Sequence, residues 1–103
     1  YQGIMDGCSK VKTLVPINIV VPAGTAMQYA RTKLGDVLTR DGYHLDLNIG
    51  RYTASCTWYE AIFKENVVGN NYKPEKVSGA DALTGQKAAH KAVKKPFKVS
   101  KIK

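Results

Sequence analysis

LVPINIVV, residues 14–21, is the stretch of sequence that decides the expected fold. It is rich in Val and Ile and apolar on both faces, which is typical of a strand covered on each side in a parallel sheet. Pro22 and Gly24 follow it and mark its end. We therefore expect one buried β-strand here.

A helix is predicted on each side of this strand. Before it, apolar residues recur at spacings of three and four, so one helical stripe is expected to be buried and the helix to end near Lys12. The positions of this stripe are Tyr1, Ile4, Cys8, Val11 and Val15. After the strand, Ala26 or Met27, Ala30 and Leu34 predict a short helix. The order helix, strand, helix is typical of an α/β protein with crossover connections.

The next segment is predicted to be a loop and then a well-packed helix. Residues 35–47 lose the periodicity and contain the glycines and aspartates of turns. Apolar residues then repeat at helical spacing from Ile49 to Phe63. We expect this helix to begin at a cap formed by Asp46 or Asn48.

A last helix is predicted towards the C-terminus. Ser78 with Asp81 three residues later resembles a capping box, and the helix is expected to run to about Val93. Pro96 ends it, and residues 97–103 are predicted to be a short edge strand or a frayed terminus.

The charge of the chain is concentrated at its C-terminal end. The net charge is +8 over 103 residues. Residues 1–63 hold six basic and five acidic side chains, whereas residues 64–103 hold ten and three. The lysines of this basic tail, most concentrated at about 94–103, lie among Ala and Val without arginine. We therefore favour a solvated lysine face over nucleic-acid binding.

Length and composition suit one globular domain, or part of one. The chain opens on Tyr1 without a signal-peptide pattern, and no apolar run approaches the roughly 20 residues that cross a bilayer. Cys8 and Cys56 fall on helical stripes, where free cysteine behaves as a small buried hydrophobe. Because one strand cannot make a sheet, we expect a C-terminal fragment that needs the rest of its domain, or that dimerises if it folds alone.

The most informative motif is Asp41-Gly42-Tyr43-His44, in the loop after the expected strand. A carboxylate near an imidazole can hold its tautomer and ring plane, which a general base needs. Gly42 permits a bend that brings the two side chains together. On spacing alone three interpretations stay open: a surface turn, acid–base chemistry, or a metal site that adds Asp46.

The motifs around this loop resemble those of the C-terminal block of an SGNH (GDSL-like) hydrolase-like family. The matching segments, which cover nearly the whole chain, are Pro22-Ala23-Gly24-Thr25-Ala26, Asp41-Gly42-Tyr43-His44-Leu45, Gly50-Arg51-Tyr52, Cys56-Thr57-Trp58-Tyr59-Glu60, Ala88-Ala89-His90-Lys91-Ala92-Val93 and Pro96-Phe97. The resemblance implies a three-layer α/β/α sandwich, ester hydrolysis by a Ser-His-Asp mechanism, a carbohydrate acyl ester as substrate, and a periplasmic or secreted location.

The same resemblance assigns roles to two residues. It makes His44 the base that deprotonates a serine hydroxyl and Asp41 the residue that orients its ring. No serine in the chain has the setting of the nucleophile, and no oxyanion-hole block is matched. We therefore expect the serine to lie outside this chain, and the chain alone to be inactive because nucleophile and base work as a unit.

Further residues are weighed for substrate binding. Arg51 is a candidate to bind a carboxylate or sulfate, or else to form a surface ion pair, and Thr25 is a candidate at a pocket mouth. His90, among lysines, is expected to be an exposed helix residue. We expect no cofactor and no metal. The rival function is a noncatalytic binding or interaction domain whose lysine-rich tail contacts a polyanion.

Overall fold

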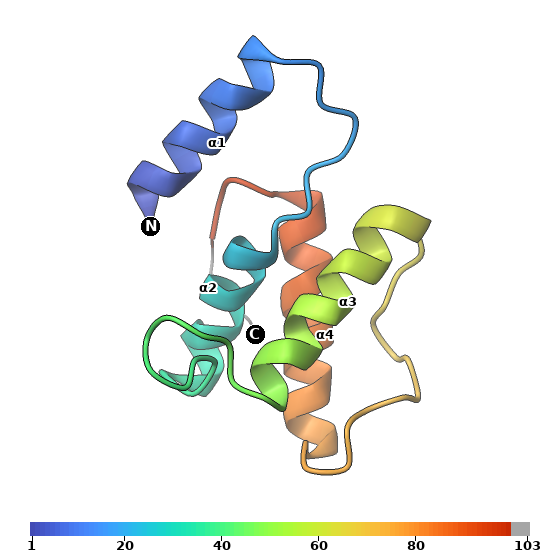
Figure 1. Cartoon of the computed structure of the whole chain (residues 1–103). Coiled ribbons are helices and arrows are strands. Elements are labelled where there is room, and N and C mark those ends of the chain that lie inside the picture. The colour runs from blue at the N-terminus through green and yellow to red at the C-terminus, as the bar shows by residue number, and fades with distance from the viewer. Residues whose placement is uncertain (100–103) are drawn as a thin grey trace.

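The computed structural model describes residues 1–99, and these residues form four helices. They are α1 (Gln2–Leu14), α2 (Ala23–Leu34), α3 (Ile49–Phe63) and α4 (Gly79–Lys94). Helices α2, α3 and α4 pack on one another, whereas α1 lies beside this bundle (Figure 1). Within residues 1–99, α1 packs along none of the other helices. It is tied to the start of α2 by Tyr1 and Met5, which both contact Thr25.

The expected α/β/α sandwich is wrong, because residues 1–99 contain no strand and no sheet. Helix α1 runs on to Leu14, and the chain then crosses to α2 as an unpaired segment that starts with Val15 in extended conformation (φ −132°, ψ 150°). A strand exists only through hydrogen bonds to a neighbouring strand. No second extended segment lies beside residues 15–22 in the described part of the chain, and Pro16 cannot donate a backbone hydrogen bond.

The two helices predicted after the loop of residues 35–47 are present. Helix α3 has the expected bounds, and the side chain of Asp46 accepts hydrogen bonds from the backbone N–H groups of Asn48 and Gly50 near its start. At the start of α4, Ser78 accepts from the backbone N–H of Asp81 at 3.1 Å. The edge strand considered for residues 97–103 lies partly on residues 100–103, outside the described residues. Its first three residues form no strand.

The bundle core is built on small side chains. Ala26 and Ala30 of α2 are fully buried, as are Ala88 and Ala92 of α4, and all four belong to one apolar cluster. Because the separation of packed helices depends on the side chains at their contact, alanines allow these two helices to approach closely. Tyr29 fills the same cluster with a large buried ring.

The connection between α3 and α4 is held by buried polar groups. Gln86 of α4 accepts from the N–H of Gly69 and donates to the carbonyl of Asn70 and to the hydroxyl of Tyr52. The Tyr52 hydroxyl in turn donates to the carbonyl of Tyr72 at 2.7 Å. Each of these buried groups is therefore satisfied, which removes the cost of burying them.

Gly50 permits a close approach between α3 and the preceding loop. A Cβ at this position would lie 2.3 Å from the carbonyl oxygen of Leu38 and 3.1 Å from Cβ of Asp46. The first of these is a backbone atom, which cannot rotate away. Only glycine therefore fits at this position without a steric clash.

We predict that Gly50→Ala destabilises the chain, because the methyl group would push the loop off α3. The expected loss in the free energy of unfolding is about 1–3 kcal/mol. Gly24→Ala is the matched control, since a Cβ on Gly24 meets nothing within 4 Å, and it should raise stability by about 0.5–1 kcal/mol. Urea denaturation of both variants measures the difference, and equal midpoints would contradict the close contact.

Candidate functional site

Within the predicted loop of residues 35–47, residues 38–46 (the site loop) are closed on themselves. Thr39 and Leu45 pair in an isolated antiparallel bridge. The N–H of Asp46 donates to the carbonyl of Leu38 at 2.9 Å. The two ends of the loop are therefore held together, and the residues between them form a tight turn.

The turn brings Asp41 and His44 into contact, as expected from their spacing. Oδ2 of Asp41 lies 2.8 Å from Nδ1 of His44. Its other oxygen, Oδ1, accepts from the backbone N–H groups of Tyr43 at 2.8 Å and His44 at 2.6 Å. Gly42 has φ +78°, a conformation that residues with a Cβ rarely adopt. Both carboxylate oxygens are therefore engaged inside this turn of four residues.

These hydrogen bonds fix the protonation state of the carboxylate. The bond from the His44 ring, then the two backbone N–H groups and the nearby charge of Arg40, lower the pKa of Asp41 to about 2. Because an ionised carboxylate only accepts, Nδ1 of His44 must carry a proton. In the neutral ring this leaves Nε2 with its lone pair, and Nε2 has no hydrogen-bond partner among residues 1–99. The contact thus fixes the orientation of the ring and leaves Nε2 as the nitrogen that can accept a proton.

The pair lies at the surface rather than in a pocket. The His44 and Asp41 side chains are 56% and 52% exposed, and the ring of Tyr43 meets the imidazole edge-on with centroids 4.7 Å apart. Tyr43 is itself strongly exposed. The pair is thus open to a group approaching from outside the chain.

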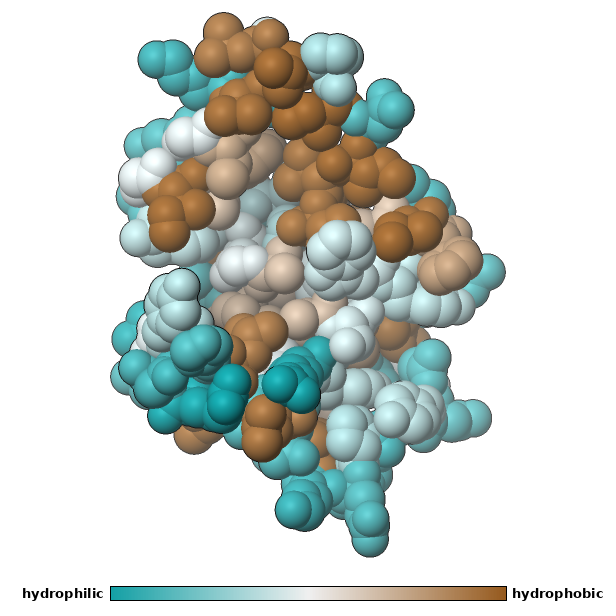
Figure 2. Space-filling view, viewed as in Figure 1, coloured by the Kyte–Doolittle hydropathy of each residue, from teal (hydrophilic) through white to brown (hydrophobic). Residues whose placement is uncertain are grey.

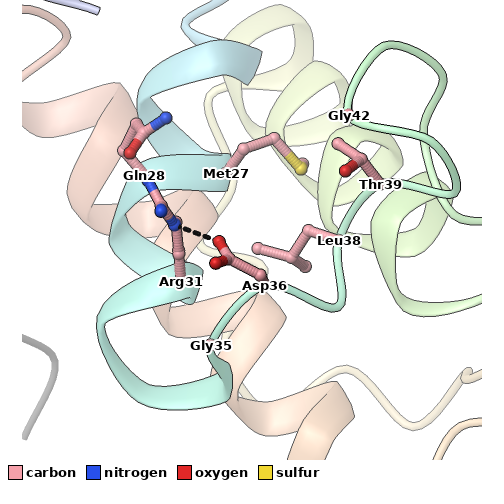
Figure 3. A pocket seen from close by; sticks show the side chains of 8 residues that line it. All are labelled: Met27, Gln28, Arg31, Gly35, Asp36, Leu38, Thr39 and Gly42. Atoms are coloured by element: carbon pink, nitrogen blue, oxygen red, sulfur yellow. Dashed lines mark hydrogen bonds and ion pairs between the residues drawn. The ribbon is translucent and has the colours of Figure 1, made fainter.

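A hollow of about 240 Å³ lies on the neighbouring side of the loop, between it and α2 (Figure 3). Gly42 borders this hollow, but His44 does not. Arg31 of α2 forms an ion pair with Asp36 across part of it, and Met27 points towards Thr39 (Figure 3). The hollow could receive part of a ligand that also reaches the loop, but its walls do not include the histidine.

Within residues 1–99, neither of the two residues weighed for substrate binding forms a hydrogen bond or ion pair with Asp41 or His44. Thr25 is fully buried, and its hydroxyl is bonded to the carbonyl of Pro96 and to Met5, so it offers no surface to a ligand. Arg51 is exposed in the first turn of α3, and within residues 1–99 its guanidinium makes no ion pair. The alternative of a surface ion pair for Arg51 is therefore not realised.

A second carboxylate–histidine pair lies inside the bundle and was missed by the sequence analysis. Oε1 of Glu60 is 2.6 Å from Nδ1 of His90, and Oε2 accepts from the N–H of Val67 at 3.0 Å. The two side chains are 7% and 22% exposed, so His90 is not the exposed residue that was expected. The sequence did contain one signal for this pair. Glu60 follows Cys56 by four residues, so the two lie on the same, inward side of α3.

Neither a metal-binding group of side chains nor a candidate membrane-spanning helix is found in the described part of the chain. Residues 1–99 bring together no group of three His, Cys, Asp or Glu side chains that could hold a metal ion, and Asp46 instead caps α3. Among these residues, no helix combines the length and the apolar character that crossing a membrane requires.

Comparison with known proteins identifies a different family from the one that the motifs suggested. The family model described as "Domain of unknown function (DUF4886)" matches residues 1–92. A crystal structure of a DUF4886 family protein from Bacteroides uniformis ATCC 8492 is 50% identical over 97% of this chain, with a TM-score of 0.93. The match spans 39% of that protein's length. No curated protein matches the chain.

The resemblance to SGNH (GDSL-like) hydrolases is therefore corrected, and the classification as a hydrolase that rested on it is unsupported. The family match is to DUF4886, and the helical fold of residues 1–99 lacks the parallel sheet that the resemblance implied. The chain belongs to the DUF4886 family.

Proposed function

We propose that this chain contributes Asp41 and His44 as a general-base pair for the hydrolysis of an ester, and that the hydroxyl nucleophile comes from polypeptide outside this chain. The observation that supports the proposal is the 2.8 Å contact between Asp41 Oδ2 and His44 Nδ1. A carboxylate that only shapes a turn needs one oxygen for the backbone, yet here the second oxygen binds the ring.

The proposed chemistry begins with proton transfer to Nε2 of His44. The hydroxyl gives its proton to Nε2 as its oxygen attacks the ester carbonyl, and Asp41 stabilises the imidazolium that forms. The imidazolium then returns that proton to the departing alkoxide, which leaves as an alcohol. A water molecule then gives a proton to Nε2 as its oxygen attacks the carbonyl of the acyl intermediate. The imidazolium returns this proton to the oxygen of the nucleophile, so the carboxylic acid is released and the hydroxyl and neutral His44 are regenerated. Asp41 stays ionised throughout.

The activity test uses a hybrid protein, in which this chain replaces the matched portion of the Bacteroides uniformis protein. His44→Gln should lower its turnover of p-nitrophenyl acetate by about 10²–10⁴-fold, and Asp41→Asn should lower it too, because the ring loses its fixed tautomer. Glu75→Gln, at an exposed carboxylate of the connection between α3 and α4, is the matched control and should keep full turnover. Unchanged turnover in His44→Gln would end the proposal.

The ionisation of Asp41 can be measured in the chain itself. Carboxyl ¹³C NMR should give a midpoint near pH 2 for Asp41, against 3.8 for an ordinary aspartate. Because the folded pKa is the lower one, the stabilising contribution is complete above pH 3.8 and is lost as the pH falls through about 2. His44→Gln should move the midpoint upwards, since the ring is the largest cause of the shift. A midpoint unaffected by this substitution would contradict the contact.

A second candidate function is the binding of a polyanion near the end of α4. Here Tyr29, His90, Lys91, Lys94 and Lys95 line a cavity of about 340 Å³. Lys91 Nζ lies 6.0 Å above the Tyr29 ring. Ammonium groups on one wall attract phosphate or sulfate groups, and binding releases counterions.

Heparin binding tests this second function. If the cavity wall binds sulfate groups, affinity falls steeply with salt, and Lys94→Gln with Lys95→Gln should reduce the slope of log K against log [salt] by about one per lysine. Lys10→Gln with Lys12→Gln on α1 removes the same charge and should leave the slope unchanged. Equal effects of the two double variants would show that only net charge matters.

A further inference from the structure

Helix α1 carries an apolar stripe that nothing in the described chain covers. Its spacing predicts burial, yet Ile4 is 66% exposed, Val11 48% and Val15 47%. Met5 is the one buried residue of the helix. An isolated helix of this length is marginal in water, and most helices in proteins are stabilised by packing of their apolar face. The stripe is therefore a surface that lacks its packing partner.

The segment after α1 continues the same surface. Residues 15–22 turn back beside the helix and leave a groove of about 460 Å³ between the two. The groove is lined by Ile4, Gly7, Cys8, Val11, Ile17, Ile19 and Val20, none of which carries a charge. Apolar side chains gather over α1 and this segment in the upper part of Figure 2. A contiguous exposed apolar patch of this kind marks an interaction surface in soluble proteins.

The comparison with the longer relative indicates what covers the groove. That protein matches 97% of this chain with a TM-score of 0.93, so its fold includes the counterpart of nearly all of this chain. The match uses 39% of its length, so most of its polypeptide lies outside the matched part. Polypeptide of the same chain meets the groove at high effective concentration, whereas a second copy would have to bind from solution.

We propose that the groove between α1 and residues 15–22 (the α1 groove) is the contact surface for the part of the longer DUF4886 polypeptide that lies outside this matched region. The contacting surface is apolar and uncharged, since the groove offers no charged side chain to pair with it. Packing there buries the stripe of α1 and orders residues 15–22 against the rest of the protein.

The reactivity of the Cys8 thiol reports whether the α1 groove is covered. It is exposed and lines the groove, whereas Cys56 is buried. Burial also raises the pKa of the Cys56 thiol, which further slows its reaction. Alkylation by iodoacetamide, followed residue by residue with mass spectrometry, therefore reports on coverage of the groove at Cys8 while Cys56 serves as the internal control.

The test compares the isolated chain with the hybrid protein defined above. Coverage predicts that Cys8 reacts at least about tenfold more slowly in the hybrid, while Cys56 stays slow in both. Ile19→Asp in the hybrid should restore rapid labelling of Cys8, because a carboxylate cannot be buried in an apolar contact without great cost. Leu83→Asp, at an exposed leucine of α4 outside the groove, should leave Cys8 protected.

Two results would overturn the proposal. One is equal Cys8 labelling in the isolated chain and the folded hybrid. The other is protection in the isolated chain that rises with protein concentration, which would assign the groove to a second copy. Should the hybrid fail to fold, the Bacteroides uniformis protein with cysteine at the position aligned with Cys8 gives the same readout. Ester hydrolysis is not measured here, so this proposal and the general-base proposal fail separately.

Discussion

The contact of the Leu38 carbonyl with the first turn of α3 is the constraint on which the site loop depends. It is possible because residue 50 is glycine. Asp46 reinforces it from the other side: its N–H donates to Leu38, its carboxylate accepts from Asn48 and Gly50, and its carbonyl accepts from Arg51. One residue therefore closes the loop and caps the helix, so the turn that carries the histidine is held by α3.

The connection between α3 and α4 is held in another way, by side chains of the two helices. Residues 64–78 have no regular structure, and long polar side chains of α3 and α4 bind three of their backbone groups. Glu60 binds the N–H of Val67, and Gln86 binds both Gly69 and Asn70. Loops normally lie on the surface because their backbone groups need water, and these two side chains replace that water. The bundle thus encloses Val67 and Val77 in its second apolar cluster.

The two carboxylate–histidine pairs of the chain have the same contact and opposite environments. Glu60 with His90 is enclosed, and Glu60 also binds a backbone N–H of the neighbouring loop. This is the pattern of a pair that secures packing. Asp41 with His44 is open to solvent, and Nε2 has no partner within residues 1–99. The carboxylate–imidazole contact alone does not distinguish the two pairs. The exposed Nε2 is the feature that favours the proposed proton transfer at His44 rather than at His90.

Sequence alone determined the features that depend on neighbours along the chain. The bounds of α3, the Ser78 cap of α4 and the contact between Asp41 and His44 were predictable, because each involves residues within one turn of helix or one tight bend. Tertiary structure decided the rest. Residues 14–21 have the composition of a buried strand but no partner to pair with among residues 1–99, and Glu60 meets His90 across 30 residues of chain. Burial and pairing between distant residues depend on how the elements pack, which local periodicity does not encode.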